Sequence, residues 1–292
     1  MHCSYKTTKT SIILFILFIL GSLSTSASEG NLPLLKENII RIEQPPEIQY
    51  NSALIQEKGL NILVYESWDG YHVRKGNLHY SQVDMSKEKT KFTPPKVVSA
   101  HKNAKIRTSV SQVTINNDEW LYYIESNSYK SEAIAYRAKL VDGSLVEQQT
   151  LSLGMPISPA SNARWHVVDG NKVGLVYREK LCCKLYFSIS NNGIDFGEFS
   201  YIGNAGSMPY LSSFKDGKLL YLFQKGFKTS KTKANGEPIF IMKSHFRMSS
   251  DMGKTWGDPH TLDLKHLSAA KFHLNYCLSL ILPGDFVYRF QL

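Results

Sequence analysis

Residues 164–179 read RWHVVDGNKVGLVYRE. β-Branched and aromatic residues lie on both sides of Asp169-Gly170, which predicts two antiparallel strands joined by a tight turn. Glycine and Asn or Asp suit such a turn because they adopt positive φ at low cost. Three further stretches share this design, namely SALIQEKGLNILVYE at 52–66, SQVTINNDEWLYYIE at 111–125 and PYLSSFKDGKLLYLFQ at 209–224.

These hairpins recur along the chain at long intervals. Their turns fall at 59, 118, 170 and 217, so the spacings are 59, 52 and 47 residues. A further strand pattern follows each hairpin, at 78–83, 133–140, 184–190 and 244–250, and then a turn and a short outer strand. Repeats of three or four strands in about 40–50 residues are typical of propeller blades, whereas a sandwich has no such period. We therefore expect an all-β chain, a β-propeller with about five recognisable four-stranded units in residues 46–292, after a lead-in at 29–45.

The N-terminus has the pattern of an export signal. Lys6 and Lys9 precede an apolar run at 12–20, and small residues follow up to Ser28. The apolar run is about half the roughly 20 residues that a membrane span requires. Residues 1–28 are therefore predicted to be a signal peptide, which implies a secreted or periplasmic protein with no stable membrane span in the mature chain.

Charge and cysteine content limit the partners. The formal charge of +9 falls to +7 without the two signal lysines, and a basic surface attracts anionic glycans or surfaces. No dense Lys/Arg block and no nucleic-acid motif is present, so we expect no nucleic acid partner. Of the four cysteines, Cys3 lies in the predicted signal peptide, and the other three are Cys182, Cys183 and Cys277. An odd number excludes a full disulfide framework but leaves one bridge to Cys277 open beside buried thiols. Their spacing fits no metal site, and no cofactor is expected.

Residues 249–256 read SSDMGKTW and match the pattern S-x-D-x-G-x-T-W at every specified position. The aspartate can accept N–H bonds across a hairpin turn, and the glycine supplies positive φ. A weaker copy, SNNGIDF, lies at 190–196, and Phe92 ends a more distant one. The five specified residues are predicted to be structural, and they are Ser249, Asp251, Gly253, Thr255 and Trp256.

Through this motif and the repeat, residues 46–285 resemble the sialidase superfamily, also called BNR or Asp-box repeat proteins. The resemblance implies a six-bladed propeller with a ligand site on the central axis. Five units of about 52 residues do not fill six blades, so we expect the sixth blade to be missing, incomplete or supplied differently, as in a truncated product.

The resemblance also implies an arginine clamp for a sugar carboxylate, a tyrosine nucleophile with an activating glutamate, and an aspartic acid as proton donor. Asp69 in the loop after the first hairpin is the candidate acid, and Tyr276 is the candidate nucleophile. Arg178 fits a clamp position, and Trp68 is a candidate for substrate binding by stacking. A plain Asp-Gly turn and a core tyrosine are the structural alternatives for Asp69 and Tyr276.

Other site positions depart from the family pattern. Tyr50 stands where the first arginine is expected, and Asn162 or Arg164 stands in place of the glutamate. Arg247 is expected to point to solvent. Trp165 with His166 is a second candidate stacking pair, with core packing as its alternative.

These departures favour a sialidase-like propeller that recognises a glycan or glycoprotein over a working enzyme. Two alternatives remain open. One is an exo-acting, sialidase-like glycoside hydrolase on terminal acidic sugars, and the other is a different propeller enzyme.

Overall fold

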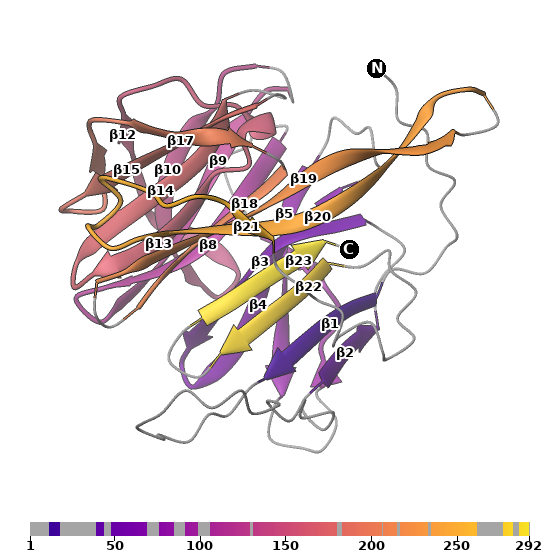
Figure 1. Ribbon diagram of the computed structural model, residues 1–292. Coiled ribbons are helices and arrows are strands. Elements are labelled where there is room, and N and C mark those ends of the chain that lie inside the picture. The colour runs from indigo at the N-terminus through magenta and orange to yellow at the C-terminus, as the bar shows by residue number, and fades with distance from the viewer. Residues whose placement is uncertain are drawn as a thin grey trace, which may run out of the picture.

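The computed structural model describes the backbone of thirteen stretches, which are 12–17, 39–43, 48–68, 76–84, 91–98, 106–128, 131–179, 183–205, 207–214, 217–232, 235–261, 277–282 and 286–291. Strands make up most of these residues (Figure 1). Within them the one helical element is the short 3-10 turn η2 (Pro159–Ser161). No helix in this described part is long and apolar enough to cross a membrane.

The four hairpins predicted from the sequence are confirmed. Each joins a first and a second strand, and the pairs are β3 (Ile48–Glu57) with β4 (Leu60–Trp68), β8 (Ile106–Ile115) with β9 (Asp118–Ser126), β13 (Arg164–Asp169) with β14 (Lys172–Glu179), and β18 (Ser207–Ser213) with β19 (Leu219–Thr232). Positive φ at Lys58, Gly59, Asn116, Asn117 and Gly170 shows why the turns carry glycine and asparagine.

The third and fourth strands complete four antiparallel units. The third strands are β5 (Gly76–Asp84), β10 (Ile134–Val141), β15 (Cys183–Ser190) and β20 (Pro238–Ser249). The outer strands are β6 (Lys91–Phe92) with β7 (Lys96–Val97), β11 (Ser144–Thr150), β17 (Ser200–Ala205) and β21 (His260–Thr261). A single parallel bridge from Gly76 to Ile106 joins the first two units into one nine-stranded sheet. A short parallel pair, β12 (Ser152–Leu153) with β16 (Asp195–Phe196), links the second unit to the third.

A further sheet combines the two ends of the chain in the order β2-β1-β22-β23. Its strands are β1 (Ile12–Leu17), β2 (Ile39–Glu43), β22 (Cys277–Leu282) and β23 (Phe286–Gln291). β1 lies within the apolar run assigned to the export signal, so export stays a prediction. The number of blades likewise stays a prediction.

The apolar cores lie between successive units, as in stacked blades. Adjacent residues Tyr122 and Tyr123 of β9 are both fully buried, yet they enter different cores because neighbouring strand residues point to opposite faces. Tyr122 packs against Trp165 and Leu175 of the third unit, whereas Tyr123 packs in the core shared with the first unit. Full burial of one such side chain contributes about 1.5–3 kcal/mol. β9 therefore contributes to two interfaces at once, and so does β14, which places Leu175 in one core and Val176 in the next.

In the second, third and fourth units, a glycine at the tip of the outer hairpin fits against an aromatic ring of the preceding unit. Gly143 lies against Tyr80, Gly193 against Tyr122, and Gly253 against Phe187. A Cβ atom added at any of the three would lie within 3.0 Å of the ring atoms or the hydroxyl. All three glycines also have positive φ. The sequence repeat thus produces a repeated contact between units.

The SSDMGKTW turn is held by a closed set of hydrogen bonds. The Ser249 hydroxyl donates to Asp251 Oδ1 at 2.8 Å and accepts the Gly253 N–H at 2.8 Å. Asp251 accepts the Thr255 N–H at 2.9 Å and the Thr255 hydroxyl at 2.5 Å. The Trp256 indole donates to the Gly253 carbonyl at 3.1 Å. Every specified residue of the motif therefore has a contact that explains its identity.

The weaker copy at 190–196 folds in a similar way with an asparagine in place of the aspartate. Asn192 Oδ1 accepts the Ser190 hydroxyl and the N–H groups of Ile194 and Asp195, each at 2.9 Å. Phe196 is buried in the core between the second and third units. Trp256 is partly buried against the core between the third and fourth units. The two turns thus share one pattern of hydrogen bonds, with Asp251 and Asn192 in the same place.

We predict that Gly253→Ala destabilises the protein by about 2–4 kcal/mol, from positive φ and from overlap with the buried Phe187 ring. The matched control is Gly59→Ala, which has nearly the same φ but nothing within 4 Å of the added Cβ, and should cost about 1 kcal/mol. Urea denaturation measures both. Equal losses in the two variants would show that the contact with Phe187 is unimportant.

A second prediction concerns pH. Hydrogen bonds from the Thr255 hydroxyl, the Thr255 N–H and the Ser249 hydroxyl lower the pKa of Asp251 to about 2. Its folded pKa lies below the ordinary value of about 3.9, so its contribution to stability is present above about pH 4 and is lost as pH falls through 2. The difference in melting temperature between the wild type and Asp251→Asn should therefore shrink over that range. A difference that is constant with pH would contradict this.

Candidate functional site

Only part of the site expected from the sequence can be located. Asp69 and Tyr276 lie outside the described residues. The backbone of Trp68 ends β4 and pairs with Ile48 and Gly76. Arg178 is half-buried near the end of β14, opposite Leu185 of β15. The convergence of Asp69, Arg178 and Tyr276 on one pocket therefore stays a prediction.

Arg178 lies beside a buried phenol. Burial raises the pKa of Tyr221 well above its usual value, and the positive charges of Arg178 and Arg247 oppose that rise. The Tyr221 hydroxyl has no hydrogen-bond partner among the described residues, and the side chain is fully buried. The second stacking pair is not a sugar platform, because Trp165 is only 3% exposed and packs in the core, as its structural alternative stated.

The two most deeply buried carboxylates of the described chain are both engaged in structural contacts. Glu66 accepts the Thr108 hydroxyl at 2.6 Å, the Val110 N–H at 3.2 Å and the Ser109 N–H, which ties β4 to β8. Glu125 forms an ion pair with Arg107 at 3.0 Å, and both side chains are less than a tenth exposed. Carboxylates held in this way are poorly placed to exchange protons with a substrate.

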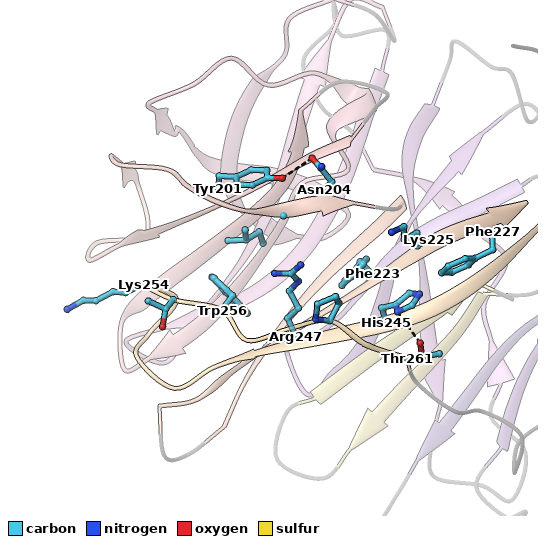
Figure 2. A pocket seen from close by; sticks show the side chains of 14 residues that line it. Tyr201, Asn204, Phe223, Lys225, Phe227, His245, Arg247, Lys254, Trp256 and Thr261 are labelled. Carbon is cyan, nitrogen blue, oxygen red and sulfur yellow. Dashed lines mark hydrogen bonds between the residues drawn. The ribbon is translucent and has the colours of Figure 1, made fainter.

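A groove of about 590 Å³ lies between the outer strand β17 of the third unit and strands β19, β20 and β21 of the fourth (Figure 2). We call it the basic groove. Its positive groups are Lys225, Arg247 and Lys254, with His245 beside them. Its aromatic groups are Tyr201, Phe223, Phe227 and Trp256. No Asp or Glu occurs among the fourteen described residues that line it.

Arg247 corrects an expectation from the sequence. It is half-buried rather than directed at solvent, and Figure 2 shows its side chain reaching from β20 toward β17 between Trp256 and Phe223. The close approach to β17 depends on Gly203, where an added Cβ would lie 3.2 Å from Arg247 Nη2. Gly203 has φ of 137°, which also favours glycine. The guanidinium is thereby held at the floor of the groove.

The SSDMGKTW turn supplies one end of this groove. Lys254, Thr255 and Trp256 all line it. Trp256 also packs edge-on against Phe187 and Tyr221, with ring centroids 5.4 and 6.1 Å apart. The structural motif therefore positions a cation and an aromatic ring at a surface that could receive a ligand.

His245 occupies the other end. Its ring stacks on Phe223 at 5.5 Å and lies 5.6 Å from Phe227. Burial lowers its pKa, and the charges of Lys225 and Lys243 lower it further. The Thr261 hydroxyl lies 3.4 Å from Nδ1, and the buried Nε2 has no hydrogen-bond partner in the described part of the chain. An anion in the groove would reverse the effect of the lysines and favour the protonated ring.

The basic groove was missed in the sequence because its residues come from four strands and a turn spread over positions 201–261. No dense cluster of basic residues appears in the linear chain. Pairing of β19 with β20 places Lys225 directly opposite Lys243, eighteen positions away. The one local signal was Phe223-x-Lys225-x-Phe227, which puts two aromatic rings and a cation on one face of a strand.

No family model matches the chain, and no curated protein matches its sequence. Solved structures do resemble it. An α-L-arabinanase from Penicillium chrysogenum in complex with arabinobiose has a TM-score of 0.53 at 11% identity, covering 81% of this chain and 72% of that one. A protein of unknown function from Dyadobacter fermentans has a TM-score of 0.52 at 12% identity, covering 82% and 74%.

An α-L-arabinofuranosidase from Fusarium graminearum in complex with an iminosugar inhibitor has a TM-score of 0.49 at 12% identity, covering 73% of this chain. The present chain spans 66% of that enzyme, just under two thirds. The likeness to the arabinanase shows that the fold is a β-propeller of the kind found in glycoside hydrolases.

We predict that the His245 ring titrates below the ordinary value of about 6.5 and that its midpoint rises in Lys225→Gln, because that change removes a repelling charge. Adding inorganic sulfate should raise the midpoint in the wild type as well. NMR of the imidazole resonances measures the shift, and Lys96→Gln, an exposed lysine of the first unit, is the matched control. If neither Lys225→Gln nor sulfate shifts the midpoint, the groove does not hold anions near His245.

Proposed function

We propose that this chain binds anionic carbohydrate in the basic groove and does so without catalysis. One observation carries the proposal, namely that Arg247, Lys225 and Lys254 line a groove whose described wall has no carboxylate. Arginine binds carboxylate or sulfate groups through paired N–H donors. The exposed faces of Tyr201 and Phe227 offer flat apolar surfaces on which the C–H faces of a sugar ring can stack.

The same groove lacks the parts of a hydrolase. Most glycosidases use two carboxylic acids, and sialidases use a tyrosine instead of one of them. Tyr201 lines the groove, but its hydroxyl donates to Asn204 Oδ1 at 2.8 Å and faces no activating glutamate in the described wall. Binding is therefore the function that these groups support best.

Two finer statements belong with this proposal. The SSDMGKTW turn and its weaker copies support descent from the sialidase superfamily. Export directed by residues 1–28 would bring the chain to extracellular or periplasmic glycans and glycoproteins.

The alternative function is exo-hydrolysis of terminal acidic sugars at the axial site, with Asp69, Arg178 and Tyr276. A fluorogenic sialoside assay on the purified chain separates the two functions. Turnover that disappears in both Asp69→Ala and Tyr276→Phe would contradict non-catalytic binding.

We predict that sialyllactose binds the purified chain and that lactose, its neutral counterpart, does not bind comparably. Arg247→Gln should weaken sialyllactose binding by about 10- to 100-fold, since a hydrogen bond to a charged group contributes about 1.5–3 kcal/mol. Lys96→Gln is the matched control and should bind as the wild type does. Isothermal titration calorimetry measures all four cases. Equal affinity for both sugars, or an unaffected Arg247→Gln, would overturn the proposal.

A further inference from the structure

The hairpin formed by β19 and β20 extends well beyond its own sheet (Figure 1). The inner strand β18 pairs with β19 only between Ser207 and Ser213, so its register ends at Gln224. Outer strand β21 pairs only with His245 and Phe246 of β20. Residues 225–232 and 238–243 therefore continue as a two-stranded extension with no third strand among the described residues, which we call the basic arm.

The charged residues of the basic arm are almost all positive. Lys225, Lys228, Lys231 and Lys243 are all exposed. The sequence between positions 225 and 243 has one acidic residue, Glu237. Lys225 and Lys243 face each other across the strands, and both ammonium groups lie over the Phe227 ring, at 5.8 and 5.2 Å from its centre.

This arrangement does little for stability. An isolated two-stranded hairpin is marginal in water, and like charges directly opposite each other destabilise a strand pair. Phe227 is 37% exposed, so the arm keeps an aromatic ring in solvent between two cations. A bound anion would relieve the repulsion between Lys225 and Lys243, which suggests that the charges serve binding.

The arm is continuous with the basic groove. Lys225 and Phe227 line the groove and also begin the arm. From Lys225 to Lys231 the strand advances six residues, or about 20 Å at roughly 3.3 Å per residue. A ligand that contacts both the floor of the groove and Lys231 must therefore be a chain of several sugar units.

We infer that the basic arm extends the groove into a binding surface for a linear polyanionic polysaccharide, and that the ligand is such a chain rather than a single terminal sugar. This inference rests on the proposed function. Charge complementarity favours a polyanion. The aromatic rings within the cationic track favour sugar rings over a surface of phospholipid head groups.

The test compares a heparin disaccharide with a heparin octasaccharide on the purified full chain. The octasaccharide should bind at least about tenfold more tightly, because a second contact made by the same molecule has a high effective concentration. In the double variant Lys228→Gln/Lys231→Gln, the octasaccharide should bind no more tightly than the disaccharide, and the affinity for the disaccharide should be unchanged. The salt dependence of octasaccharide binding should also weaken, because fewer counterions are released.

Lys96→Gln/Lys172→Gln is the matched control, because it removes the same charge from other units and should keep the full gain. Failure of the disaccharide to bind would contradict the proposed function. If the disaccharide binds but the octasaccharide binds no more tightly, the role of the basic arm is contradicted and the proposed function is not. The same conclusion follows if the octasaccharide still binds more tightly in the arm variant. Equally tight binding of anionic phospholipid vesicles or duplex DNA, lost in the same arm variant, would overturn the assignment to a polysaccharide.

Discussion

The contact between a turn glycine and an aromatic ring of the preceding unit is the constraint on which the rest of the structure depends. The Phe187 ring can approach Gly253 only because this residue has no Cβ atom. The hydrogen bonds of the SSDMGKTW turn hold Gly253 at positive φ. A larger residue would push the two units apart and open the core between them. The same turn carries Lys254 and Trp256 into the basic groove, so the packing of two units also builds the candidate site.

The described units differ in how strongly their turns are held, and the differences follow from side-chain chemistry. Asp251 offers two oxygens and a negative charge, whereas Asn192 offers one acceptor oxygen and uses its amide to reach Asp195 at 2.7 Å. In the second unit, Asp142 bonds instead to Lys58 at 2.8 Å, across to the first unit. Each variant keeps the glycine that fits the neighbouring ring. Close packing between units thus constrains the glycine more than the polar residues around it.

Local features could be predicted from the sequence, and features that depend on distant pairing could not. Each of the four hairpins, and likewise the SSDMGKTW turn, is encoded within about fifteen consecutive residues. The structure has these features at the expected positions. The basic groove gathers residues from positions 201 to 261, so it appears only once β17 and β20 face each other. Arg247 is the clearest case, because its close approach to Gly203 of β17 involves a residue 44 positions away. The prediction that Asp69 and Tyr276 belong to the site depended on motif resemblance alone.

The proposal of binding without catalysis rests on the distribution of charge. Glu66 accepts backbone N–H groups of β8 and so ties the first unit to the second, whereas the buried Glu125 pairs with Arg107 within the second unit. Removing either would leave a buried partner unsatisfied, which is costly. The cations of the groove have no carboxylate among the described residues that line it. The proposed capture of an anion therefore rests on Arg247, Lys225 and Lys254 of the groove, and not on Arg107, which is buried beside Glu125.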